Sequence, residues 1–88
     1  MPIISQFYGI IVSMFFNDTD KHHMPHIHVQ YAEYRCVFDF DGNILSGNIP
    51  NRQRKLMQAW IELRKEDLNT LWNILQNGNN GFTIEPLK

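Results

Sequence analysis

The stretch that decides the fold is His22-His23-Met24-Pro25-His26-Ile27-His28-Val29-Gln30-Tyr31, which holds all four histidines of an 88-residue chain. From His26 onward polar and apolar residues alternate, which is the period of a half-buried β-strand. Pro25 suits the start of such a strand, because proline has no N–H to give to a ladder. We therefore expect His26 and His28 to project from one face of the strand.

The following run, Tyr34-Arg35-Cys36-Val37-Phe38-Asp39-Phe40, alternates in the same way. Only Ala32-Glu33 separates the two runs, which predicts the turn of an antiparallel hairpin. The apolar pattern sets the register, because a slip by one residue would turn polar groups into the core. The apolar face then pairs Tyr31 with Tyr34, Val29 with Cys36 and Ile27 with Phe38. The other face pairs Gln30 with Arg35, His28 with Val37 and His26 with Asp39.

The sequence before and after this hairpin extends it into an antiparallel β-meander of about four strands, within residues 9–46. Gly9 to Phe16 is rich in β-branched and aromatic residues, which is typical of a covered strand. Asp41-Gly42-Asn43 is a turn signal, and Ile44-Leu45-Ser46 can return beside Phe38. Ile3 and Ile4 could add an edge strand.

A helical half follows at residues 50–77, with Pro50 near the first turn. One helix from Asn51 to Asn77 would be about 40 Å long, which is too long for so small a globule. We therefore expect a break near Arg64 to Glu66 and two helices on the apolar face of the sheet, which makes a two-layer α+β fold. Within the tail at 79–88, Phe82-Thr83-Ile84 could form a short strand.

The length indicates one domain, residues 1–88. A formal charge of −1 and an isoelectric point near 6.4 give no global attraction to nucleic acid or anionic lipid. Cys36, the single cysteine, is expected on the apolar face as an inert thiol. The apolar run from Phe7 to Phe16 is too short to span a bilayer, and the start lacks the basic residues of a signal peptide. We predict a cytoplasmic protein that binds no membrane.

The histidine-bearing face allows four interpretations. An antiparallel sheet commonly leaves one face to water, so the histidines could be ordinary surface residues. They could instead hold a transition metal such as zinc, with His22, His26 and His28 as ligands, or with His23, Asp18 or Asp20 replacing His22. That spacing is not one of a closed structural zinc site, so an open site would be expected.

The third interpretation is metal-free cleavage of RNA, which needs a base, an acid and a cation for the charge that builds on phosphorus. His26 and His28 could be base and acid, Asp39 could orient His26, and Arg35 could meet the phosphate. No cofactor is then required. The fourth interpretation is binding without catalysis. Basic residues in the first turn of a helix oppose its dipole, which an anionic partner would explain. These residues are Arg52, Arg54 and Lys55.

Motifs along nearly the whole chain carry a family resemblance. They are Phe7-Tyr8-Gly9-Ile10, His22, Pro25-His26-Ile27-His28-Val29, Tyr31, Tyr34, Val37-Phe38-Asp39, Gly47, Pro50, Arg52, Trp60, Glu62-Leu63 and Ile84-Glu85-Pro86-Leu87. Together they resemble the small bacterial family DUF4160, a domain of unknown function. The chain departs from the family at Met24, where a second proline is usual, and in a longer loop from Asn17 to Lys21. Members are small, and many are encoded beside another small reading frame in an arrangement similar to a toxin–antitoxin pair.

The resemblance implies a toxin-like component held by a cognate small protein. Our leading hypothesis combines this with an endoribonuclease site at His26, His28, Arg35 and Asp39. The alternative is a non-catalytic binding module, either the neutralising partner or a metal-binding interaction domain. An open sheet edge could also pair two copies into a homodimer.

Overall fold

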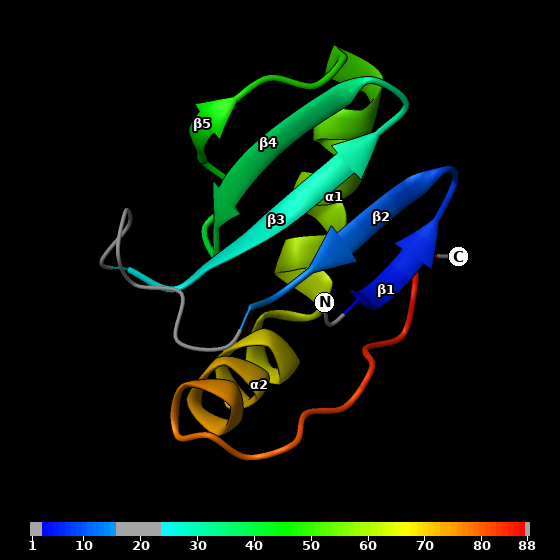
Figure 1. Cartoon of the computed structure of the whole chain (residues 1–88). Helices are drawn as coiled ribbons and strands as arrows, with labels where there is room; N and C mark the ends of the chain where they lie inside the picture. Colours follow the sequence, from blue (N-terminus) through cyan, green and yellow to red (C-terminus); the bar gives the residue numbers. More distant parts are fainter. Residues whose placement is uncertain (1–2, 16–23, 88) are drawn as a thin grey trace.

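The structure, a computed structural model, describes residues 3–15 and 24–87 of the chain. Its elements are β1 (Ile3–Phe7), β2 (Ile10–Ser13), β3 (His26–Tyr31), β4 (Tyr34–Asp39), β5 (Ile44–Gly47), α1 (Asn51–Leu63) and α2 (Lys65–Gln76). The strands form one antiparallel sheet in the order β1-β2-β3-β4-β5, as Figure 1 shows. The predicted α+β meander followed by two helices is confirmed. The described part of the sheet has one strand more than the predicted four, because Ile3–Phe7 joins it as an edge strand.

The register of the central hairpin agrees with the prediction at all six pairs, from His26 opposite Asp39 to Tyr31 opposite Tyr34. The residues predicted to face inward are almost fully buried: Ile27, Val29, Cys36 and Phe38 are each 4% exposed or less. β5 returns beside β4 as expected, with Ile44 opposite Phe38 and a bulge between Val37 and Phe38.

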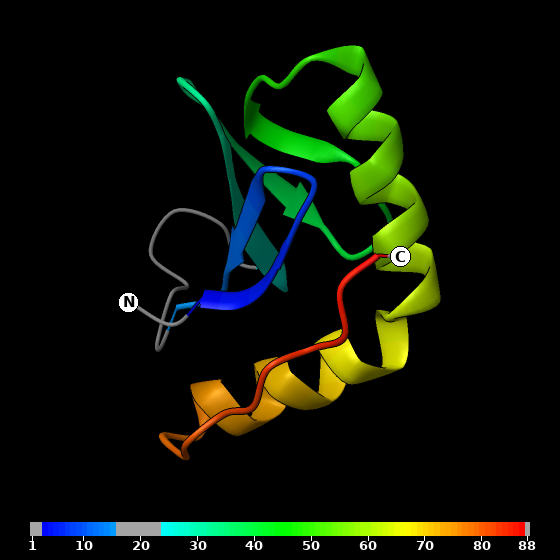
Figure 2. The same cartoon turned by 90° about the vertical axis from the view of Figure 1, so that its right-hand side faces the viewer.

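Helix α1 lies behind the sheet and covers its apolar face, which Figure 2 shows from the side. Its buried stripe, Met57, Trp60 and Ile61, is at most 1% exposed. The predicted break occurs at Arg64, where φ of −112° and ψ of 17° leave helical geometry. α2 bends there and runs beneath one end of the sheet instead of continuing along its face (Figure 2). Among the described residues, no helix is long and apolar enough to cross a membrane.

The C-terminal segment passes back beside β1 (Figure 1). The predicted strand at Phe82 to Ile84 does not form, because the segment makes one backbone bond to β1, from Ile84 N–H to the Ile4 carbonyl at 2.7 Å. The segment is held instead by a side chain of the core. The indole N–H of Trp60 donates to the Glu85 carbonyl at 2.8 Å, and Ile84 is 4% exposed. The tail therefore ties α1 to the edge of the sheet.

Candidate functional site

The sheet face opposite α1 carries two cross-strand rows of side chains. One row runs through Ser13, His28, Val37 and Ser46, and each residue is the register partner of the next. The neighbouring row runs through Ile11, Gln30 and Arg35. In this face the two rows lie two residues apart along each strand, which is roughly 7 Å.

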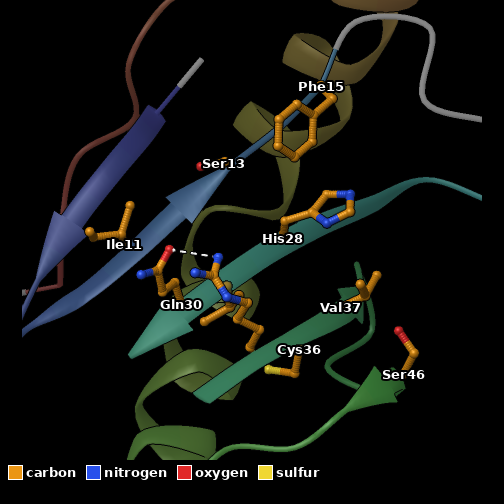
Figure 3. Close-up of a pocket in the computed structure, with 10 residues that line it drawn as sticks. Ile11, Ser13, Phe15, His28, Gln30, Cys36, Val37 and Ser46 are labelled. Carbon is orange, nitrogen blue, oxygen red and sulfur yellow. Dashed lines mark hydrogen bonds between the residues drawn. The ribbon is translucent and has the colours of Figure 1, made fainter. Parts of the chain in front are cut away.

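A pocket of about 260 Å³ opens between these rows. Its lining combines apolar groups with a few polar ones, which is typical of a small ligand site. The residues are Ile11, Ser13, Phe15, His28, Val29, Gln30, Arg35, Cys36, Val37 and Ser46. Figure 3 shows Phe15 beside His28 at one end and Gln30 farther along β3. We call this site the open-face pocket.

Arg35 is the cation of the open-face pocket. Its side chain is exposed, and its Nη1 donates to Oε1 of Gln30 at 3.2 Å (Figure 3). This bond holds one corner of the guanidinium and leaves its other N–H groups for a ligand, because a guanidinium carries five donors. An arginine so placed suits a phosphate or carboxylate.

Aromatic rings follow one another across the end of the sheet near α2. The ring of His28 lies 4.6 Å from that of Phe15 and 5.3 Å from that of His26, in both cases edge to face. The His26 ring in turn lies 5.3 Å from the indole of Trp72 in α2. His28 therefore contacts both the Phe15 ring, which lines the pocket, and the buried His26 ring.

His26 is 1% exposed, so it lies inside the molecule although it belongs to the open face by register. The reason is the bend at Arg64, which brings Trp72 against the end of the sheet. Nδ1 of His26 lies 2.8 Å from the Met24 carbonyl, so this nitrogen carries the proton and donates it. This contact fixes the ring at the start of β3.

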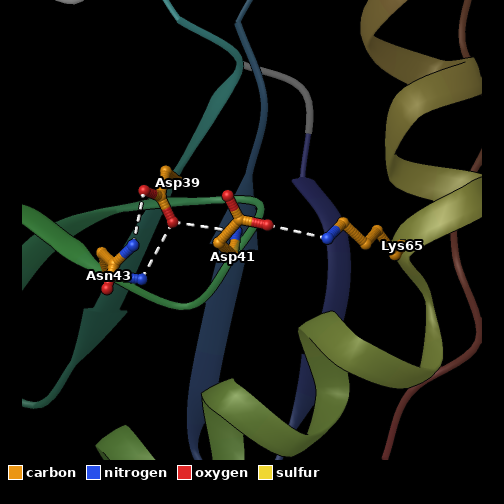
Figure 4. A network of polar contacts seen from close by, with 4 residues as sticks. All are labelled: Asp39, Asp41, Asn43 and Lys65. Atoms are coloured by element: carbon orange, nitrogen blue, oxygen red, sulfur yellow. Dashed lines mark hydrogen bonds and ion pairs between the residues drawn. The ribbon is translucent and has the colours of Figure 1, made fainter.

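Asp39 lies opposite His26 in the register, and its carboxylate organises the turn from β4 to β5. One oxygen accepts from the backbone N–H groups of Asp41 and Asn43, both at 2.9 Å. The other accepts from Nδ2 of Asn43 at 3.0 Å, as Figure 4 shows. Burial disfavours the charged carboxylate, but the bonds from Asn43, Asp41 and Gly42 outweigh it and hold the pKa of Asp39 below its ordinary value.

The same turn is attached to both helices. Lys65, the first residue of α2, pairs with Asp41 at 2.7 Å (Figure 4), and this ion pair raises the pKa of Lys65. Gln58 of α1 donates from Nε2 to the Gly42 carbonyl at 3.1 Å. Asp39 therefore belongs to a structural junction among the sheet and the helices.

The basic side chains at 52, 54 and 55 lie away from the pocket. Arg52, Arg54 and Lys55 are exposed in the first turns of α1, which covers the other face of the sheet. Arg54 is engaged locally, because its guanidinium donates to the side chain of Asn51. The structure therefore separates these cations from His28 and Arg35.

The described residues alone do not form a three-ligand metal site. Within residues 3–15 and 24–87, no group of three His, Cys, Asp or Glu side chains is placed to hold a metal ion. His22 and His23, and the acidic residues Asp18 and Asp20 considered with them, lie outside the described residues. His26 and His28 have neighbouring rings, but their ring contacts alone indicate no particular metal.

Cys36 is 4% exposed, and burial raises the pKa of its thiol to about 11. A thiol that stays protonated at neutral pH is a poor nucleophile. This agrees with the structural role expected of it.

Phe15 and Ser46 are site residues that the sequence analysis did not select. Phe15 shares strand parity with Ile11 and Ser13, but its place beside His28 depends on the β2–β3 register. Ser46 reaches the pocket through its pairing with Val37. The alternation along each strand could therefore have shown which face of the sheet these two side chains occupy. It could not show which residues of other strands lie beside them.

Comparison with known proteins gives one family. The family described as Domain of unknown function (DUF4160) matches residues 9–73, which include the hairpin, the open-face pocket and most of both helices. No curated protein and no solved structure matches the chain.

Proposed function

The chain belongs to the DUF4160 family, and from this premise we propose that it is a toxin-like component of a bacterial toxin–antitoxin-type module, acting on RNA through the open-face pocket. The observation that carries the proposal is the placement of one half-buried imidazole, His28, and one exposed guanidinium, Arg35, in the same pocket. A cognate small protein would neutralise the component by covering this face.

The chemistry assigned to the pocket is cleavage by the ribose 2′-hydroxyl. His28 accepts the proton of that hydroxyl, its oxygen bonds to phosphorus, and the bond to the 5′-oxygen breaks. Water supplies the proton to the leaving oxygen, because the pocket is open to solvent. Arg35 donates hydrogen bonds to the phosphoryl oxygens, where negative charge builds in the transition state.

His26 and Asp39, which the sequence offered as catalytic residues, take no direct part in this reaction. His26 is 1% exposed and packs on Trp72, so RNA cannot reach it without opening the fold. Asp39 uses both of its oxygens in the β4–β5 turn. Both residues support the site by fixing the ends of β3 and β4.

The second candidate is a non-catalytic binding module that uses the same pocket. The burial of His26 favours it, because acid–base cleavage is most efficient with two proton-transfer groups and the described pocket offers one histidine. In that case Arg35 and His28 would bind an anionic group of a partner and release it unchanged.

The test combines growth and RNA cleavage. Induced expression of the chain should stop bacterial growth, and the purified chain should cleave added RNA. Replacement of His28 by Asn keeps a polar side chain of similar size but removes the proton-transfer group. We expect His28→Asn to reduce cleavage by at least about 100-fold, the usual contribution of general acid–base catalysis.

The matched control is Asp41→Asn, which removes one charge from an exposed side chain outside the pocket. It should cleave RNA and stop growth as the unchanged chain does. Intact RNA with the unchanged chain would favour the binding module. Equal cleavage by the chain and His28→Asn would remove His28 from the site.

A further inference from the structure

We infer that the open-face pocket takes one unpaired nucleotide of a single strand, with its base against Phe15, its ribose at His28 and its phosphate at Arg35. This inference rests on the proposed function and names the form of nucleic acid that the site accepts. It is carried by the size of the pocket and by the order of side chains along it.

The size of the pocket suits one nucleotide better than a duplex. Its volume of about 260 Å³ is slightly below the range of pockets that hold drug-sized ligands. It is bounded by side chains of adjacent strands, and a flat ring is a group that can fit between them. In a duplex the bases are stacked and paired, whereas an unpaired base can turn outward into such a site.

The two ends of the pocket differ in chemistry. At one end, Phe15 is a half-buried ring that meets His28 at 4.6 Å. Aromatic side chains are common stacking partners of unpaired bases, and stacking tolerates every base because each has a π-face. At the other end, Arg35 is exposed and is aligned by Gln30. Its guanidinium suits a phosphate.

The order along the strands matches the order within a nucleotide. Phe15 lies beyond the row of Ser13 and His28, and Arg35 lies in the next row on the opposite side. His28 therefore stands between the ring and the cation. A base at Phe15 and a phosphate at Arg35 would place the ribose beside the imidazole, where its 2′-hydroxyl must be for the proposed chemistry.

Gln30 adds donor groups at the phosphate end. Its Oε1 is occupied by Arg35, and its side-chain NH₂ makes no bond among the described residues. Both residues line the pocket, and both carry N–H donors. This favours an acceptor-rich group such as phosphate over a cationic or amide ligand.

The experiment measures binding separately from cleavage. The probe is a fluorescent ten-nucleotide DNA strand, free or annealed to its complement, because DNA lacks the 2′-hydroxyl and stays intact. Fluorescence anisotropy should give at least about tenfold tighter binding of the single strand. Phe15→Leu should weaken that binding by about tenfold, which is within the effect of losing one stacked base.

Arg35→Gln should weaken binding and lower the slope of log affinity against log salt by about 0.7, the share of one phosphate contact on a single strand. The matched controls are Phe82→Leu, a ring that is 41% exposed in the C-terminal segment, and Lys65→Gln, an exposed cation at the start of α2. Both controls should bind as the unchanged chain does. Thermal melts of all variants should be measured first, so that affinities are compared between folded proteins.

Equal binding of single strand and duplex would overturn the inference, and so would equal effects of Phe15→Leu and Phe82→Leu. Absence of binding to both probes, as expected if the pocket takes a protein partner, would overturn it as well. These outcomes are distinct from failure of the proposed function. Cleavage of RNA that depends on His28 can be present without single-strand preference, and DNA binding that depends on Phe15 can be present without cleavage.

Discussion

Replacement of Asp39 by Asn should destabilise the fold strongly, because this carboxylate organises the β4–β5 turn. It accepts three hydrogen bonds of 2.9, 2.9 and 3.0 Å from Asp41 and Asn43. An amide can keep the two backbone bonds in weaker form, but its NH₂ would face Nδ2 of Asn43. Losing one charge-assisted hydrogen bond and weakening two others should lower the free energy of unfolding by about 2–3 kcal/mol. For a domain of this size that lowers the melting temperature by about 8–24 °C.

The effect should also depend on pH with a defined sign. The pKa of Asp39 is lowered in the folded protein from its ordinary value of 3.8, so the folded state favours the charged carboxylate. The stabilisation is therefore fully present above that value and is lost as the pH falls through the lower, folded pKa. Asp39→Asn has no such titration. The difference in stability between the two proteins should be constant at pH 5–7 and shrink below about pH 4.

The assay is urea or thermal unfolding followed by circular dichroism between pH 2 and pH 7. Asp41→Asn is the matched control, because its carboxylate makes an exposed ion pair with Lys65. Ion pairs between exposed side chains are screened by solvent and contribute little, so this control should change stability little. Equal effects of the two substitutions, or an Asp39 effect unchanged at low pH, would refute the structural role. Complete loss of RNA cleavage by a folded Asp39→Asn protein would return Asp39 to the active site.

Three further predictions concern the core and its edges. Gly47→Ala should destabilise by about 2–4 kcal/mol in urea unfolding, because φ is +78° and a Cβ there would lie 2.2 Å from the Arg35 carbonyl oxygen; unchanged stability would contradict that close approach. Trp60→Phe should lower the free energy of unfolding by about 2–3 kcal/mol, because it removes the hydrogen bond from the indole to the Glu85 carbonyl. The C-terminal segment should then be cleaved faster in limited proteolysis, and an unchanged cleavage rate would refute the role of this bond. The Cys36 thiol should react slowly with a disulfide reagent in the folded protein, and rapid labelling at pH 8 would contradict this. Its pKa is about 11 in the folded protein and 9.0 ordinarily, so the stability difference between the unchanged protein and Cys36→Ala should fall from pH 9 to pH 11.

The hairpin could be predicted from sequence because its alternation and its two-residue connection leave one register that buries every apolar side chain. The pairs from His26–Asp39 to Tyr31–Tyr34 needed no information from elsewhere in the chain. The break near Arg64 followed from the length limit on a single helix in a small domain. These features are local, and local patterns determine them.

The surroundings of His26 could not be predicted in the same way. The sequence places a break at Arg64 but does not give the direction that α2 takes after it. That direction brings Trp72 against His26 and buries the imidazole. The place of Phe15 depends likewise on the pairing of β2 with β3, which are separated by a long connection. The sequence predicted the turn at Asp41-Gly42-Asn43 but assigned Asp39 to His26, and the bonds of its carboxylate to Asp41 and Asn43 were missed.

The most direct test of the central claim is an NMR titration of ¹⁵N-labelled protein with the single-stranded decamer. If the open-face pocket is the working surface, shift changes should concentrate at the backbone amides of His28, Gln30, Arg35 and Ser46. Changes confined to the first turn of α1, at residues 51–55, would contradict the account, because those residues lie beyond the opposite face of the sheet.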